Sequence, residues 1–128
     1  MYWCFHCYAV NDHPRGPCDV CGEPVEEPAG LSYVDRLVWA LDHPDGDRAV
    51  VAAGVLGKLR ARESVSALRE TVETGRDSYV RGAALRSLLD IEGPAALHPW
   101  LVALTSTAPF IIRDIARQAL ETVDAAET

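Results

Sequence analysis

Four cysteines occur within the first 21 residues in the pattern C-x2-C-x10-C-x2-C, as Cys4, Cys7, Cys18 and Cys21. Each pair can present two thiolates to one ion, and four thiolates complete a tetrahedral site. The pattern predicts one structural zinc ion, because no coordination position is left open for catalysis. A segment of this size buries too little surface to fold alone, so metal binding should supply its folding free energy.

Two other uses of the cysteines stay open. A rubredoxin-like iron site also has four thiolates and would make the protein an electron carrier. Two disulfides are the other alternative, and disulfides are typical of exported proteins. A signal peptide for export would have a basic segment followed by an apolar one, whereas Met1 leads directly into Tyr2 and Trp3. We therefore expect a cytoplasmic protein, in which disulfides are rare. His6 and His13 could replace a cysteine, yet the four cysteines already complete a site, so we expect both histidines to be exposed.

The spacing around the cysteines resembles the Ran-binding-protein-type zinc finger, and also the generic bacterial zinc ribbon. The resemblance rests on Trp3, Asn11 and Arg15. It implies that these three residues bind single-stranded RNA or ubiquitin, although Tyr8–Ala9 lacks the Thr-Phe pair associated with ubiquitin. Residues 1–30 contain one basic and five acidic residues, which opposes binding to a phosphate backbone. RNA binding is therefore kept as an alternative function.

Downstream of residue 30 the apolar residues recur every three or four positions, which is typical of helices. The chain aligns with itself at an offset of 32 residues, which predicts three helix pairs. Small residues align in one row and large apolar residues in two others: Ala52, Ala84 and Ala116; Leu56, Leu88 and Leu120; Leu59, Ile91 and Val123.

The first helices of the three pairs are predicted at residues 32–42, 63–74 and 94–106, and the second helices at 47–59, 77–91 and 109–123. Asp77 is expected to cap the fourth helix, and Gly75 and Gly93 to end helices with a positive φ. Pro99 predicts a kink or a late start in the fifth helix.

The fold class is therefore all-α, a three-repeat solenoid preceded by a small zinc ribbon or knuckle. The predicted boundaries are 1–24 for the knuckle, 25–30 for a linker, 31–124 for the solenoid and 125–128 for a tail.

Residues 31–123 resemble the HEAT repeat family, especially its short bacterial type that also occurs in phycobilin lyases. The resemblance is carried by Val80-Arg81 with Ala84, Leu88 and Ile91, and by Ile112-Arg113 with Ala116, Leu120 and Val123. Ala49 replaces the family's arginine in the first repeat, and Pro109 replaces its aspartate in the third. Arginine makes up eleven of the twelve basic residues, a bias typical of high-GC bacterial genomes.

The second helices of a short solenoid form a concave face that usually binds proteins or peptides. Arg81, Arg86, Arg113 and Arg117 lie on these helices and could form a basic stripe for an acidic partner. The resemblance gives Arg81 and Arg113 an alternative role inside the fold, as the family's intramolecular arginine. It assigns no such role to Arg86 and Arg117, which are therefore more available to a partner.

The net charge of −7 argues against binding duplex nucleic acid or an anionic membrane through counterion release. No window of eighteen apolar residues and no catalytic constellation is found in the sequence. The predicted function is a non-catalytic, zinc-binding adaptor or accessory subunit that binds another protein.

Overall fold

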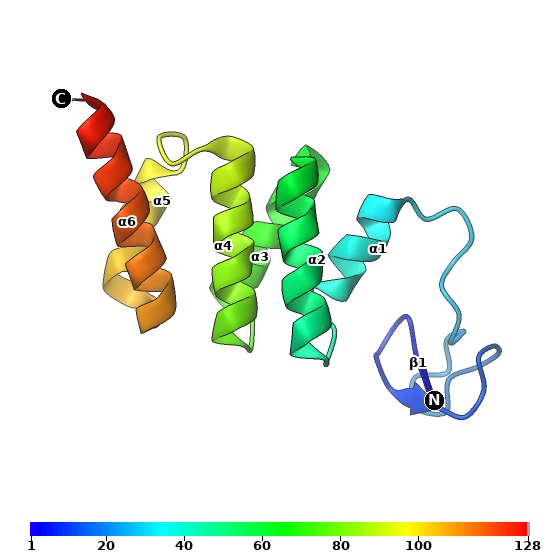
Figure 1. Cartoon of the computed structure of the whole chain (residues 1–128). Helices are drawn as coiled ribbons and strands as arrows, with labels where there is room; N and C mark the ends of the chain where they lie inside the picture. Colours follow the sequence, from blue (N-terminus) through cyan, green and yellow to red (C-terminus); the bar gives the residue numbers. More distant parts are fainter. Residues whose placement is uncertain (128) are drawn as a thin grey trace. The chain divides into compact units, whose positions relative to one another are not determined.

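The computed structural model describes residues 1–127, and the chain divides into two compact units between Tyr33 and Val34. Each unit is described by itself. The N-terminal unit contains two short strands, β1 (Tyr2–Trp3) and β2 (Val10–Asn11). The helices are α1 (Tyr33–Ala40), α2 (Gly46–Leu59), α3 (Val65–Thr74), α4 (Ser78–Glu92), α5 (His98–Thr107) and α6 (Phe110–Glu127), with a 3-10 turn, η1 (Arg62–Ser64), before α3 (Figure 1).

The second helix of each pair forms one layer of the helical unit. Helices α2, α4 and α6 lie side by side, with α3 and α5 behind them (Figure 1). Helix α4 packs against α2, α3 and α6 and is the centre of the stack. The predicted all-α repeat architecture is confirmed.

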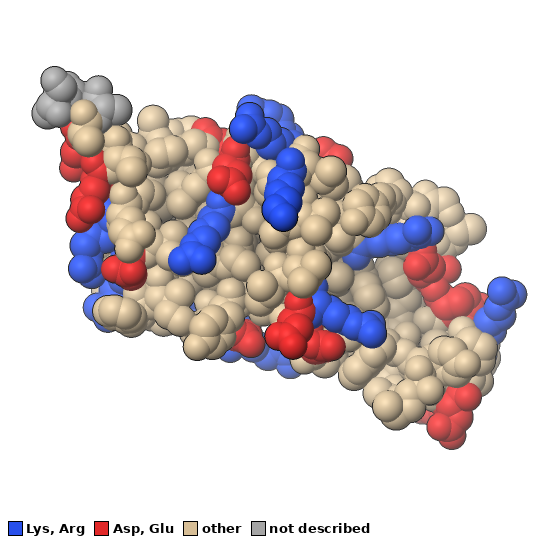
Figure 2. Space-filling model, in the orientation of Figure 1, with Lys and Arg blue, Asp and Glu red and all other residues tan. Residues whose placement is uncertain are grey.

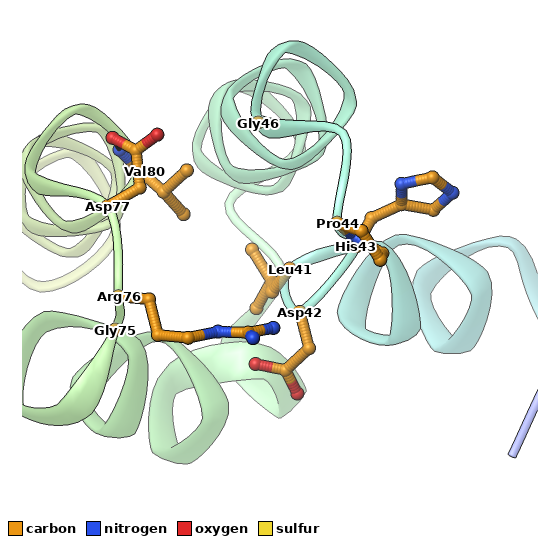
Figure 3. Close-up of a pocket in the computed structure, with 9 residues that line it drawn as sticks. All are labelled: Leu41, Asp42, His43, Pro44, Gly46, Gly75, Arg76, Asp77 and Val80. Carbon is orange, nitrogen blue, oxygen red and sulfur yellow. Dashed lines mark hydrogen bonds between the residues drawn. The ribbon is translucent and has the colours of Figure 1, made fainter. Parts of the chain in front are cut away.

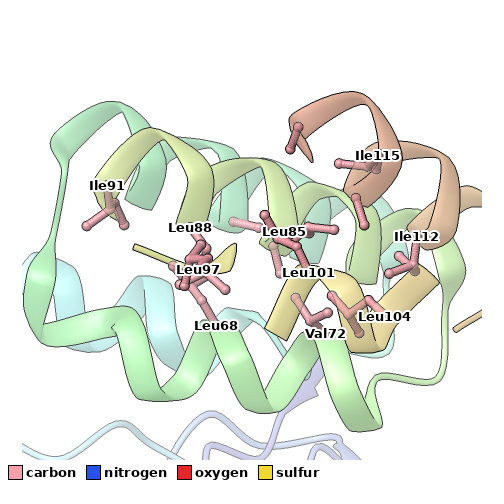
Figure 4. Close-up of a cluster of buried hydrophobic side chains, with 14 of the residues drawn as sticks. Leu68, Val72, Leu85, Leu88, Ile91, Leu97, Leu101, Leu104, Ile112 and Ile115 are labelled. Atoms are coloured by element: carbon pink, nitrogen blue, oxygen red, sulfur yellow. The ribbon is translucent and has the colours of Figure 1, made fainter. Parts of the chain in front are cut away.

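One continuous core runs between the two layers (Figure 4). It forms because apolar residues recur at helical spacing and the two faces they create must cover each other. Leu68, Leu85, Leu88, Leu101 and Ile112 are completely buried in it. The aligned alanines are buried as well: Ala52, Ala84 and Ala116. By contrast, no residue of α1 is buried, so the first helix contributes only partly buried side chains to the core.

Helices α2 and α4 approach each other closely at a glycine. A Cβ atom added to Gly57 would lie 2.9 Å from the Cα of Ser87, closer than real contacts allow. Ser87 uses this proximity, since its hydroxyl donates a 2.5 Å hydrogen bond to the carbonyl of Ala53 on α2. Gly82 provides similar room between α4 and α6, where a Cβ would lie 3.2 Å from Ile115.

Most helix ends follow the sequence signals. The Asp77 carboxylate accepts hydrogen bonds from the amides of Tyr79 and Val80, at 2.7 and 3.4 Å, and so caps α4. Helix α5 starts late, at His98, with Pro99 in its first turn, where a missing amide costs no helical hydrogen bond. Gly93 has a φ of 82°.

Two predicted helix ends are wrong. Gly75 has a φ of −59°, so it ends α3 in extended backbone instead of a positive-φ stop. Helix α6 runs to Glu127, so residues 125–127 of the predicted tail are helical, and residue 128 lies outside the described residues.

Among the helices of the described chain, none combines the length and the apolar character needed to span a bilayer.

Candidate metal centre

Two small hairpins of the N-terminal unit hold the cysteines. Strands β1 and β2 pair antiparallel, with Tyr2 opposite Asn11 and Trp3 opposite Val10, and the turn between them contains Cys4 and Cys7. A single antiparallel bridge between Pro17 and Pro24 closes the second hairpin around Cys18 and Cys21. Each hairpin therefore delivers one C-x2-C pair to a common centre.

The two turns repeat the same backbone geometry. The amide of Cys4 donates to the carbonyl of Ala9, and the amide of Cys18 donates to that of Glu23, both at 2.8 Å. The residue after each second cysteine has a positive φ, 65° at Tyr8 and 80° at Gly22. Glycine adopts this conformation without strain, whereas tyrosine does so at a cost of about 1–2 kcal/mol.

The four sulfur atoms lie close enough to share one ion. Their Sγ atoms are all within 4.8 Å of one another, and the Cys4–Cys21 and Cys7–Cys18 pairs are each separated by 3.7 Å. Four sulfurs at about 2.3 Å from a tetrahedral zinc ion would lie about 3.8 Å apart, so the arrangement fits such an ion. The same distances are far longer than a disulfide bond of about 2.05 Å. Metal binding by the cluster is thus supported by geometry as well as by spacing.

Each turn provides one buried and one exposed cysteine. Cys4 and Cys18 are buried, whereas Cys7 and Cys21 are exposed. The buried sulfurs accept backbone hydrogen bonds, from the amide of His6 to Cys4 at 3.3 Å and from that of Val20 to Cys18 at 3.4 Å. Hydrogen bonds from backbone amides stabilise the negative charge of a thiolate, and the thiolate is the form of cysteine that binds a metal ion.

The thiols differ in acidity because their hydrogen bonds differ. The backbone amide of Cys21, together with the Asn11 side chain and the Val20 amide, lowers the pKa of Cys18 to about 6. The amide of Glu23 lowers the pKa of Cys21, but desolvation of the sulfur by the surrounding turns and the neighbouring thiols outweigh it and raise that pKa to about 12. Metal binding must therefore displace a proton from Cys21, so metal affinity should fall as the pH falls.

Asn11 lies inside the centre, not on its surface. It is 2% exposed, and its Nδ2 donates to the carbonyl of Ala9 and to the Cys18 sulfur, at 3.2 and 3.5 Å. Its Oδ1 accepts a hydrogen bond from the amide of Asp19 at 3.0 Å. Asn11 thus links the first hairpin to the second, and its hydrogen-bonding groups are used within the chain.

Replacing Asn11 by Ala is expected to weaken metal affinity about 10–100-fold, because the residue orients a ligand and joins both hairpins. Competition for Zn²⁺ against a chromophoric chelator would measure the change. Asp12→Ala, at the exposed neighbouring position, is the control and should leave affinity within about twofold. Equal affinities of the two variants would show that Asn11 does not support the metal ligands.

The other residues of the N-terminal unit to which the sequence assigned a role differ in their exposure. Trp3 is half-buried on β1, and Arg15 is exposed. His6 is exposed as expected, while His13 is half-buried and its Nε2 donates to the carbonyl of Pro17 at 2.8 Å. Val25, which the sequence placed in the linker, is 3% exposed and packs with Cys4 and Cys18, so the N-terminal unit extends past residue 24.

The four arginines of the second helices do not form one stripe of equivalent groups. The Nε of Arg81 donates a 2.7 Å hydrogen bond to the carbonyl of Val72, which fastens α4 to the end of α3. The Nε of Arg113 is buried and has no hydrogen-bond partner among the described residues. Arg86 and Arg117 are exposed.

A cavity of about 300 Å³ lies between the loops that precede α2 and α4. Figure 3 shows Arg76 extending across it towards Asp42, while the imidazole of His43 points away. His43 is 5% exposed and packs edge-on against Trp39, with ring centroids 5.5 Å apart. Burial lowers the pKa of His43, and its Nδ1 accepts a 2.9 Å hydrogen bond from the amide of Asp45. His43 thus shapes the turn before α2.

Sequence reasoning missed a groove that is lined by residues of α2, α4 and α6, among them Gly54, Lys58, Tyr79 and Phe110. One signal was present in the sequence: Gly54 stands inside a helical pattern, where glycine lowers helix stability relative to alanine.

Comparison with known proteins identifies the helical unit. The family model for HEAT repeats matches residues 34–121, about two thirds of the chain. No curated protein and no solved structure matches the sequence. Stacked helix pairs, the 32-residue offset and the family match agree, and the chain belongs to the HEAT repeat family.

Proposed function

We propose that this protein is a zinc-binding adaptor or accessory subunit that binds another protein through its HEAT repeats and has no catalytic activity of its own. The observation that carries the proposal is the family match over the helical unit, since HEAT repeats commonly mediate protein interactions. Three stacked pairs offer an extended surface for such a partner.

The cysteine centre supports a structural role for the metal. Four thiolates fill a tetrahedral site, so the ion has no free position for water or substrate. Zinc suits this ligand set and has no redox chemistry, whereas iron would give an electron carrier. Elemental analysis of the purified protein and its absorption spectrum distinguish the two, because ferric tetrathiolate is red and zinc is colourless.

Nucleic-acid binding is the weaker candidate. Binding a phosphate backbone needs a cationic surface, which the N-terminal unit lacks. In addition, Asn11, one of the three residues to which nucleic-acid binding was assigned, is buried.

Affinity purification of the tagged, metal-loaded chain from its native cells, with and without nuclease, tests the adaptor function. A stoichiometric protein partner that survives nuclease supports the proposal. Loss of every partner after nuclease would favour nucleic-acid binding instead. The absence of any partner under both conditions would contradict an adaptor function.

A further inference from the structure

The groove over α2, α4 and α6 has a volume of about 620 Å³. Figure 2 shows this face in the orientation of Figure 1, and uncharged surface predominates over the three helices, with a few charged side chains among it. Two exposed aromatic residues line the groove at the starts of neighbouring helices, Tyr79 on α4 and Phe110 on α6, which are 73% and 67% exposed. Large exposed aromatics in a concave site are typical anchors for a partner's apolar side chain.

Gly54 forms part of the groove lining, and no neighbouring helix requires a residue without a side chain there. A Cβ atom placed on it would meet nothing within 4 Å, whereas Gly57 and Gly82 each make room for a neighbouring helix. A glycine inside a helix lowers stability relative to alanine. The fold alone therefore gives no reason for a glycine here, while close approach of a bound chain would.

The two cationic side chains of the groove lie near Gly54. Lys58 lies one turn beyond Gly54 on α2, and Arg86 occupies the position of α4 aligned with Gly54 at the 32-residue offset. Both are exposed, and neither forms an ion pair within 4 Å in the described part of the chain. Of the two acids that also line the groove, Asp114 accepts a hydrogen bond from Gln118 at 3.1 Å, and Asp90 lies one turn beyond Arg86.

We propose that this groove binds a peptide segment of a partner protein that carries an apolar side chain, seated against Tyr79 and Phe110, and a carboxylate, held by Lys58 and Arg86. The proposal rests on the adaptor function and specifies the chemistry of its partner. From Tyr79 to Asp90 the groove follows α4 for about 16 Å, at about 1.5 Å per residue. An extended segment of about five residues spans that length.

A library of 14-residue random peptides displayed on phage, selected on the full metal-loaded chain, tests this chemistry. The selected peptides are expected to share an apolar residue and an Asp or Glu within about five positions. Synthetic copies of the selected peptides should bind at least tenfold more weakly to Gly54→Gln, which fills the groove, and to Arg86→Glu, which reverses its charge. Gly54→Gln should fold, since its new Cβ meets open space.

Ser66→Gln and Arg62→Glu are matched controls at exposed positions outside the groove, and they should change affinity less than twofold. The proposal is overturned if no peptide is enriched, if the enriched peptides are basic, or if the groove variants bind as well as the controls. Dimerisation in sedimentation equilibrium that Gly54→Gln abolishes would also overturn it, since the occupant would then be a second copy of this chain. A nuclease-resistant protein partner retained by both groove variants would refute the groove while leaving the adaptor function intact.

Discussion

Cys18→Ala is expected to abolish metal retention and to unfold the N-terminal unit while the helices remain folded. Hydrogen bonds lower the pKa of Cys18 to about 6, and its sulfur lies 3.7 Å from that of Cys7, so the substitution removes one of the four thiolates of the candidate site. Metal binding at such sites contributes about 10–16 kcal/mol, which exceeds what the small apolar cluster of Cys4, Cys18 and Val25 can supply.

Three measurements separate the two units in this experiment. Elemental analysis gives the metal content, far-ultraviolet circular dichroism gives the helix content, and amide nuclear magnetic resonance spectra report on residues 1–33. Val20→Ala is the control, because Val20 lies in the same turn and is 75% exposed. It should keep the metal and its dispersed amide signals.

Chelation of the wild-type protein should reproduce the Cys18→Ala result. A global loss of helix in either experiment would contradict the division of the chain into two units and would mean that the HEAT repeats depend on the metal. Retention of a full equivalent of metal by Cys18→Ala would contradict the four-cysteine site.

The four-cysteine cluster was predictable because two C-x2-C pairs leave few alternatives for a centre of four thiolates. The role of Asn11 was not predictable from the sequence. A polar residue four positions after a cysteine pair is compatible with a surface contact and with a buried bridge. Its side-chain hydrogen bonds to Cys18 and Asp19, which only the folded chain shows, place Asn11 between the hairpins. Val25 shows the same limit, because the prolines around it indicate a linker although it closes the small core.

The residues that align at the 32-residue offset predicted the buried face of the helices well where the helix continues beyond the aligned residue. They failed at Leu59, which aligns with Ile91 and Val123 but is 50% exposed. Leu59 is the last residue of α2, and Arg60 turns the chain with a φ of 50°. Ala61 then enters the core in its place, at 5% exposure. Such a left-handed turn usually has glycine or asparagine, so an arginine gave no signal for it.

The different burial of leucines from the two large apolar rows leads to the second prediction, that Leu88→Ala destabilises the helical unit by about 2–5 kcal/mol whereas Leu59→Ala changes its stability by less than about 1 kcal/mol. Leu88 is completely buried on α4, the helix that packs against α2, α3 and α6. Removing its side chain leaves a cavity between both layers, and a repeat protein has few other contacts to compensate.

Urea unfolding of the metal-loaded chain, followed by circular dichroism, measures both variants on one scale. A loss of 2–5 kcal/mol is a large fraction of the roughly 5–15 kcal/mol that holds a domain of this size, so Leu88→Ala should unfold at clearly lower urea. Equal losses for the two leucines would mean that Leu59 is covered in solution. Small losses for both would mean that the core around α4 repacks, and that the stack owes its stability to contacts other than this central helix.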